Sequence, residues 1–227
     1  MKTVIKPAKI KVLVISASPN RENSTSFQLA NKVIKGIDRQ QADCEIVHLH
    51  DHKILFCRHC DKCHLHILDC PVKDDVRVIL KKMLDADAII LASPNYMSQI
   101  PAILKAVWER ASHLFHCKRL LGKYVAGVIT SGSGMDQNVL DYIKMFTNSC
   151  GAQYSGGVAS ARNCFKDKSK EAEKLGRELI IDVQDKRICP KQQAAIEAGI
   201  KRFSGIIKNY KKEWHEEYLY YQEKGWL

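Results

Sequence analysis

The sequence has no apolar run that approaches the roughly 20 residues a helix needs to cross a bilayer. Its first apolar run, residues 12–15, is also too short for the hydrophobic region of a secretory signal peptide. This run is rich in β-branched side chains and suits a buried strand instead. We therefore expect a cytoplasmic protein that has no membrane partner.

Dense blocks of lysine and arginine are also missing, although the chain of 227 residues carries a formal net charge of +11. Proteins that bind nucleic acid usually gather their basic residues on one face or along one helix, so we expect no nucleic-acid partner. Internal repeats and low-complexity linkers are absent too. With 45% hydrophobic and 27% charged residues, the composition is typical of a folded globular protein.

Two glycine-rich nucleotide motifs are lacking. The absence of G-x-x-x-x-G-K-[ST] excludes a P-loop for nucleoside triphosphates. No G-x-G-x-x-G follows the first predicted strand, which argues against a dinucleotide site of the Rossmann type there. The G-S-G at 132–134 is too short to count as that motif.

Short apolar runs alternate with amphipathic segments along most of the chain. This alternation predicts an α/β fold, with a parallel sheet covered by helices on both faces. Ligands of such sheets bind at the carboxyl ends of the strands, so we expect the loops after the first, third and fourth strands to carry function. The predicted strands are 10–16, 44–50, 87–93, 123–130 and 152–160, and the predicted helices are 26–37, 74–86, 100–115, 136–149 and 169–183.

Residues 190–225 break this alternation. We expect one domain over residues 1–185, with a cysteine-rich insertion at 53–72, followed by a helical extension over 186–227. Apolar residues three or four apart in the extension predict one sustained helix. Such a helix would pack on its own domain, or serve as a dimer contact or a lid. The stripe comprises Ile196, Ile200, Phe203, Ile207, Tyr210, Trp214, Tyr218 and Tyr221.

The first loop, SASPNRENSTSF at 16–27, leaves a predicted strand and enters a predicted helix. Thr25 and Gln28 fit a capping box, but a cap needs only one hydroxyl. A helix amino terminus presents free N–H groups and a positive dipole end, and added hydroxyls make it a cradle for a phosphate. We therefore predict phosphate binding here. The hydroxyls are those of Ser16, Ser18, Ser24, Thr25 and Ser26.

The second and third loops are SPNYMSQIP at 93–101 and TSGSGMD at 130–136. Tyr96 offers a flat aromatic face that suits the wall of a planar ring site. The glycines of the third loop permit close backbone approach, so that N–H groups reach ring carbonyls. Each loop alone is equally consistent with an ordinary turn.

Nine cysteines are present, and four of them fall within CRHCDKCHLHILDC at 57–70, spaced C-x2-C-x2-C-x6-C. Clustered cysteines in a cytosolic protein indicate metal or redox chemistry more often than disulfides. The spacing is similar to that of ferredoxin-type [4Fe–4S] loops, although those have x3 before the last cysteine. Zinc, with help from His59, His64 and His66, and a reduced loop that holds no metal are the alternatives. The three histidines also suit a polar loop surface.

Together these segments resemble a known family. SASPNRENSTS and SPNYMSQIPAILKAVWER resemble the phosphate loop and the S-P-x-Y segment of flavodoxin-like FMN reductases. CRHCDKCHLHILDCPVKDDV resembles the cysteine loop of the iron–sulfur flavoprotein branch. The resemblance covers residues 10 to 165. It departs from the usual pattern at Ala17, at Asn95 and at Glu109, none of which removes a phosphate donor.

The resemblance implies a flavodoxin-like sheet with strand order 2-1-3-4-5 and a bound FMN. It also implies a [4Fe–4S] cluster held by Cys57, Cys60, Cys63 and Cys70. The implied FMN contacts are Ser18, Asn20, Ser24, Thr25 and Ser26 around the phosphate, and Pro94, Asn95, Tyr96, Met97, Ser131, Gly132, Ser133 and Gly134 around the ring.

The implied activity is that of an FMN-dependent oxidoreductase that exchanges electrons between FMN, the cluster and an external donor or acceptor. NAD(P)H and ferredoxin are the candidate donors, and a homo-oligomer is expected because flavin sites of this family often lie at subunit contacts. A cluster-free NAD(P)H-dependent FMN or quinone reductase is one alternative. A flavodoxin-like electron carrier without enzymatic activity is the other, since fold alone does not fix function.

Overall fold

Five parallel strands form the centre of the protein in the order β2-β1-β3-β4-β5, which confirms the predicted flavodoxin-like sheet. The structure is a computed structural model that describes residues 8–132, 134–161, 164 and 167–227. The strands are β1 (Ile10–Ser16), β2 (Ala42–His48), β3 (Ala88–Pro94), β4 (Tyr124–Ser131) and β5 (Gln153–Ala161).

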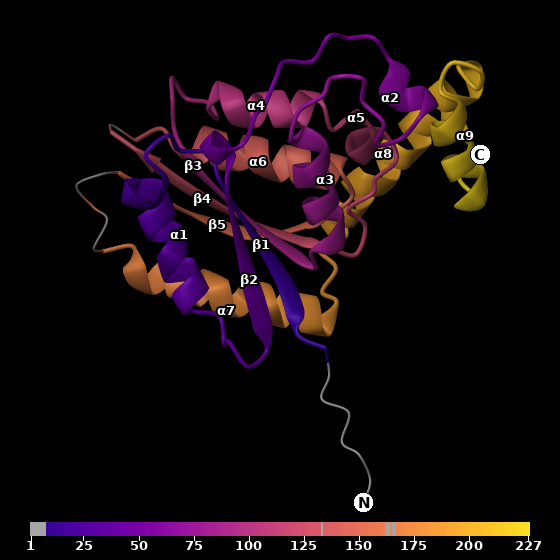
Figure 1. The fold of residues 1–227 in the computed structure, drawn as a ribbon. Coiled ribbons are helices and arrows are strands. Elements are labelled where there is room, and N and C mark those ends of the chain that lie inside the picture. The colour runs from indigo at the N-terminus through magenta and orange to yellow at the C-terminus, as the bar shows by residue number, and fades with distance from the viewer. Residues whose placement is uncertain (1–7, 133, 162–163, 165–166) are drawn as a thin grey trace, which may run out of the picture.

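Helices cover both faces of this sheet, and a pair of carboxyl-terminal helices lies to one side of these layers (Figure 1). None of the helices in the described ranges is long and apolar enough to cross a membrane. Their bounds are α1 (Thr25–Lys35), α2 (Lys62–Leu65), α3 (Val76–Asp85), α4 (Ala102–Glu109), α5 (Ser112–His116), α6 (Gln137–Ser149), α7 (Ser169–Asp185), α8 (Pro190–Asn209) and α9 (His215–Glu223), with 3-10 turns η1 (Arg21–Asn23) and η2 (Leu49–Asp51).

The apolar run of β1 is buried on both sides because successive side chains of a strand point to opposite faces. Val12 and Val14 pack in one core with α1 and α7. Leu13 and Ile15 pack in a second core with α3, α4 and α6. The strand therefore joins the two hydrophobic layers, and its carboxyl end is held at a fixed position between them.

Helices α1 and α7 approach one another through two glycines. A Cβ atom at Gly176 would lie 2.0 Å from the carbonyl oxygen of Val33, and a Cβ at Gly36 would lie 2.0 Å from that of Glu173. Only glycine fits at either position, because backbone atoms cannot move aside. This contact fixes α1 on the sheet, and with it the loop at the start of α1.

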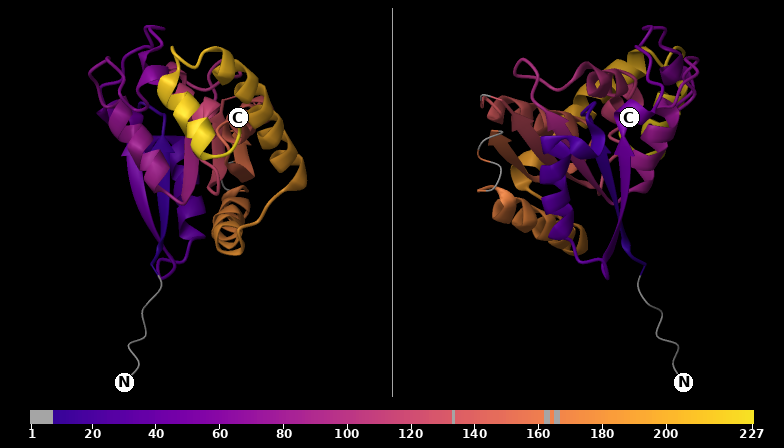
Figure 2. Two further views of the ribbon diagram at one scale, coloured as in Figure 1. Left: turned by 90° about the vertical axis from the view of Figure 1, so that its right-hand side faces the viewer. Right: turned by 60° about the vertical axis from the view of Figure 1, so that its left-hand side comes forward.

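Two predicted helices are each divided in the structure. The segment predicted as a single helix at 100–115 forms α4 and α5, because Arg110 (φ −89°, ψ 0°) and Ala111 (φ −100°, ψ 26°) leave helical geometry. The single helix predicted for the extension forms α8 and α9, with Tyr210 and Trp214 at the ends of the intervening turn. This turn redirects α9 toward the cysteine-rich segment, as Figure 2 shows for the yellow helix. Both single-helix predictions were therefore wrong.

The extension packs on the rest of the chain through a third small core. Phe203, Ile207 and Tyr221 surround Cys117, which directly follows α5. Beside them the fully buried Lys118 donates hydrogen bonds to the carbonyl oxygens of Phe115 (2.8 Å) and Ser149 (2.9 Å). The extension is thus anchored by apolar burial next to a buried amine. The division at residues 185 and 186 into domain and extension stays a prediction.

Candidate functional site

The loop after β1 ends in the amino terminus of α1, and Ser24 is its cap. The Ser24 Oγ accepts a hydrogen bond from the Phe27 N–H at 3.0 Å. The prediction that Thr25 caps the helix was therefore wrong by one residue. As a result the amides of Thr25 and Ser26, at the first two helical positions, have no carbonyl one turn earlier to bond. They are available as donors to a bound anion.

Hydrogen bonds tie this loop to the loops after β3 and β4. The Thr25 and Thr130 hydroxyls lie 3.1 Å apart. The Asn95 Nδ2 donates to the Gly134 carbonyl at 3.2 Å and to the Asp136 carboxylate at 3.1 Å. The same carboxylate accepts from the Ser131 hydroxyl at 3.0 Å. The three loops predicted to carry function are thus one connected unit at the carboxyl edge of the sheet.

A cavity of about 270 Å³ lies between these loops, which we call the loop cavity. Its lining includes most of the predicted FMN contacts, together with Asn23 and Thr130, which were not among the predicted contacts. Gly134 lies outside the lining, Met97 is 97% exposed, and Ser133 lies outside the described residues. The predicted residues that line it are Ser18, Asn20, Ser24, Thr25, Ser26, Pro94, Asn95, Tyr96, Ser131 and Gly132.

The loop after β3 is held in a strained turn beside this cavity. Tyr96 and Gln99 exchange backbone hydrogen bonds of 2.9 and 3.0 Å, and both residues between them have positive φ, 53° for Met97 and 61° for Ser98. Residues other than glycine adopt this left-handed conformation at a cost of about 1–2 kcal/mol each. The turn holds the half-exposed Tyr96 ring at the rim of the cavity.

These residues fit FMN. Hydroxyl residues and helix amides, with no charged acid in the lining, form the phosphate end, where the buried Ser18 and Ser26 line the cavity. The half-exposed Tyr96 ring lines the cavity, where a flat apolar ring could stack against it. A Cβ atom at Gly132 would meet nothing within 4 Å, so the backbone there is open to a ligand.

The four clustered cysteines line a second cavity of about 380 Å³, which we call the thiol cavity. Its walls also include Arg110 and Ser112, from the junction of α4 and α5, and Trp214 from the extension. The two cavities share no lining residue. Helix α4 runs between them, beginning after the loop that follows β3 and ending at the thiol cavity, and its 8 residues span about 12 Å.

A buried ion pair lies between the two ends of the cysteine segment. The Asp74 carboxylate pairs with both terminal nitrogens of Arg110, the Nη2 contact being 3.0 Å, and both side chains are almost fully buried. Arg110 also donates to the carbonyl oxygens of Leu55 (3.1 Å) and Val72 (3.3 Å), one on each limb of the segment. The Arg110 Nε is buried without a hydrogen-bond partner among the described residues. This ion pair therefore holds the two ends of the segment next to each other.

The thiols of this cavity lie close enough to affect the ionisation of Cys63. Burial raises the pKa of the Cys63 thiol, and the neighbouring Cys70 and Cys57 raise it further, against the 3.2 Å contact with the Ser112 hydroxyl. Thiolates of these residues would repel one another unless positive charge lay between them. The donor set of four thiols on one cavity thus fits a metal centre, and none of the four is in a disulfide.

Among the described residues, the thiols are spaced more widely than one zinc ion would hold them. Zinc–sulfur bonds of about 2.3 Å bring tetrahedral thiolates within about 4 Å of one another. Among the described residues, the one group of potential metal ligands with donor atoms within 4.8 Å of each other is His64, His116 and Glu217, and it contains no cysteine. A cubane separates its thiolates more widely because each binds a different iron.

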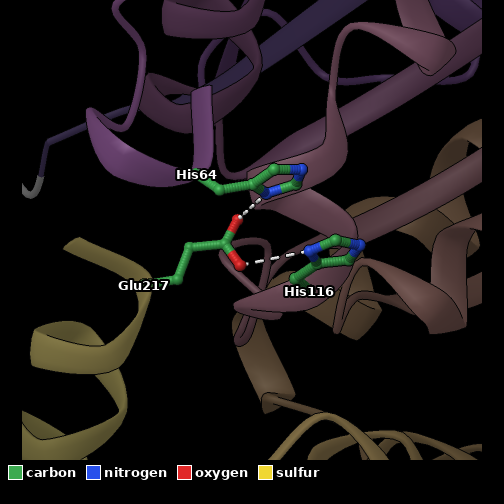
Figure 3. A group of neighbouring side chains, drawn as sticks. All are labelled: His64, His116 and Glu217. Atoms are coloured by element: carbon green, nitrogen blue, oxygen red, sulfur yellow. Dashed lines mark hydrogen bonds and ion pairs between the residues drawn. The ribbon is translucent and has the colours of Figure 1, made fainter. Parts of the chain in front are cut away.

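The histidines of the cysteine segment differ in their surroundings. The His59 side chain is 94% exposed, as predicted for a polar loop surface. His64 is buried, and the same prediction was wrong for it, because it hydrogen-bonds Glu217 of α9 (Figure 3). Burial alone would raise the pKa of the Glu217 carboxyl, but hydrogen bonds from His116 and His64 lower it. Glu217 is therefore an ionised carboxylate inside the protein.

Curated relatives carry the name iron–sulfur flavoprotein. One from Archaeoglobus fulgidus is 36% identical over 54% of this chain, which spans 60% of that relative's length. A second protein from the same organism is 26% identical over 96% of this chain and 100% of its own length. A relative from Methanocaldococcus jannaschii is 34% identical over 60% of this chain and 71% of its own.

Solved structures and a family profile agree with this picture. A flavone reductase superposes with a TM-score of 0.64 at 16% identity, covering 81% of this chain and 69% of its own. An NADH:FMN oxidoreductase in its apo form gives 0.61 at 20% identity, covering 82% and 94%. These low identities show the fold alone. The profile of the NADPH-dependent FMN reductase family, however, matches residues 10–166, and the chain therefore belongs to this family of flavin-dependent oxidoreductases.

Proposed function

We propose that the protein is an FMN-dependent oxidoreductase that carries a [4Fe–4S] cluster and passes electrons between FMN, the cluster and an external donor or acceptor. The observation that carries this proposal is the presence of two separate cavities of matching chemistry. Hydroxyls and helix amides line the loop cavity. Four thiols line the thiol cavity. The shared name of the relatives from two organisms supports the proposal.

In this proposal FMN would accept two electrons together and release them one at a time, and the cluster would transfer single electrons. The chain's own residues bind and orient. Ser18, Ser24 and Ser26 and the free amides of α1 hold the phosphate, and Tyr96 positions the ring. Cys57, Cys60, Cys63 and Cys70 are the iron ligands. No side chain of the loop cavity is assigned as an acid or base.

Metal and flavin analysis of protein purified without oxygen tests the assignment. We expect about four irons, four acid-labile sulfides and one FMN per chain. Cys70→Ala should lose iron and sulfide while keeping FMN, because the cavities share no residue. Cys44→Ala, which removes a half-buried thiol on β2, is the matched control and should keep all three.

Iron and sulfide near zero in the unaltered protein, with FMN retained, would refute the cluster and leave the cluster-free reductase. Mixing with NADPH or NADH under anaerobic stopped flow then separates enzyme from carrier. A pyridine-nucleotide reductase should lose its flavin absorbance as fast as it oxidises the nucleotide in steady-state turnover. A flavin that stays oxidised with both nucleotides would point to a protein donor such as ferredoxin.

A further inference from the structure

The extension is hydrogen-bonded to the cysteine segment through a buried carboxylate. Glu217 of α9 is fully buried, and each of its oxygens accepts one hydrogen bond, from His64 Nδ1 at 2.8 Å and from His116 Nδ1 at 3.1 Å. Figure 3 shows the carboxylate between the two rings, with each oxygen directed at a different imidazole. A buried carboxylate is tolerated only when it is paired in this way. The two histidines come from α2 and α5, so Glu217 joins three segments.

Aromatic packing surrounds this group. The imidazole rings of His64 and His116 are 6° from parallel with centroids 4.9 Å apart, and the Trp214 indole stacks on His64 at 4.4 Å. The Nδ1 atom of each ring lies within hydrogen-bond distance of a different oxygen of the carboxylate. The hydrogen bonds are therefore those of a carboxylate that bridges two N–H donors.

The preceding residue makes a second attachment. Glu216 accepts a hydrogen bond from the Ile67 N–H at 2.6 Å, and its other oxygen lies 3.2 Å from His66 Nδ1. The attached residues His64, His66 and Ile67 all belong to the spacer between Cys63 and Cys70. Two consecutive glutamates of α9 thus hold the middle of that spacer, whereas Arg110 and Asp74 hold the limbs of the segment.

The spacer is the feature in which this segment departs from ferredoxin loops, with six residues where those have three. Six residues can extend to roughly 20 Å, so an unattached spacer would leave the fourth thiol free to move away from the other three. We propose that Glu216 and Glu217 of α9 are positioning residues that fix the spacer and thereby set the separation of the Cys63 and Cys70 thiols. This inference rests on the proposed metal-binding function of the four cysteines.

The test compares Glu217→Gln and Glu216→Gln with Glu223→Gln, which removes the same charge from the exposed end of the same helix. In iron-free protein, hydrogen exchange of the amides at 64–69 should accelerate about tenfold in the first two variants, because an anchoring hydrogen bond to a charged group is lost. In iron-loaded protein, the transfer of iron to a chelator should accelerate by a similar factor. Glu223→Gln should stay within about twofold of the unaltered protein in both measurements.

Exchange that accelerates equally over the whole chain would show a general loss of stability and would overturn the positioning role. So would unchanged exchange at 64–69, or unchanged iron loss from a loaded protein. Glu216 is partly exposed, so Glu216→Gln keeps the test open if Glu217→Gln fails to fold. If the unaltered protein holds no iron, the proposed function fails, while the exchange experiment on the iron-free chain still decides whether α9 orders the spacer.

Discussion

Breaking the ion pair between Asp74 and Arg110 should be among the most damaging single changes in this protein. Both side chains are almost fully buried, with 0% and 1% of their surface exposed. Arg110→Met would leave the Asp74 carboxylate with only the amides of Leu55 (2.8 Å) and Val76 (3.2 Å) as partners. Removing one member of a buried pair costs about 3–5 kcal/mol, because the other charge stays buried without compensation.

That cost is a large share of the 5–15 kcal/mol by which most domains are stable. It should appear as a lower urea midpoint of iron-free Arg110→Met at an unchanged slope. Because Arg110 also bonds the carbonyls of Leu55 and Val72, limited proteolysis within 53–73 should become faster as well. Arg110→Lys keeps the charge but cannot form the bidentate contact with Asp74, so we expect an intermediate loss of stability.

The double variant Asp74→Asn with Arg110→Met provides the decisive comparison. It removes both charges, so it should be less destabilised than the sum of the two single variants by more than about 1 kcal/mol. Additive effects would refute the reasoning. So would a cost below about 1 kcal/mol for Arg110→Met, since that would mean Asp74 is well solvated without its partner.

Three further predictions follow from contacts described above. Thr25→Val should weaken FMN binding about tenfold in a fluorescence titration, because it deletes a hydroxyl of the loop cavity, and unchanged affinity would remove Thr25 from the site. Gly176→Ala should lower the melting temperature, at a cost of about 1–3 kcal/mol, because its Cβ would overlap a backbone carbonyl, whereas Gly205→Ala, where a Cβ meets nothing within 4 Å, should not. Burial lowers the pKa of Lys118 from 10.5 to about 8. Between these two pH values the unfolded chain keeps a proton that the folded chain has lost. The free energy of unfolding therefore rises with pH, by at most about 1.4 kcal/mol per pH unit. Lys118→Met should lack this rise in urea titrations at pH 8 and 10, and an identical rise in the variant would assign it to other groups.

The parts of the fold that the sequence predicted are those with a local signal. The run at 10–16 is apolar and β-branched on both faces, and β1 has those bounds. The clustering of hydroxyls before α1 placed the loop cavity. Neighbouring hydroxyls, however, compete for the cap, and nothing local distinguishes Ser24 from Thr25 as the residue that bonds the third helical amide.

Contacts between distant segments had no such signal. Glu217 meets His64 across 153 residues, and neither the spacing of the cysteines nor the stripe of the extension indicates this pairing. The helix breaks before Trp214, and this break makes the pairing possible, yet the apolar spacing in the sequence continues across it. Asp136 likewise joins two loops only because β3 and β4 lie side by side. The assignments of individual residues to FMN and iron remain predictions.

Helix α4 begins after the loop that follows β3, and its last residue, Glu109, lines the thiol cavity. An α-helix carries about half a positive charge at its amino end and half a negative charge at its carboxyl end. Asp74 neutralises Arg110, so that side chain does not cancel the negative end. An electron is consequently lower in energy beside the first turn of α4 than beside its last. If the proposed FMN and cluster occupied the two cavities, the backbone dipole of this one helix would favour an electron on the flavin over an electron on the cluster.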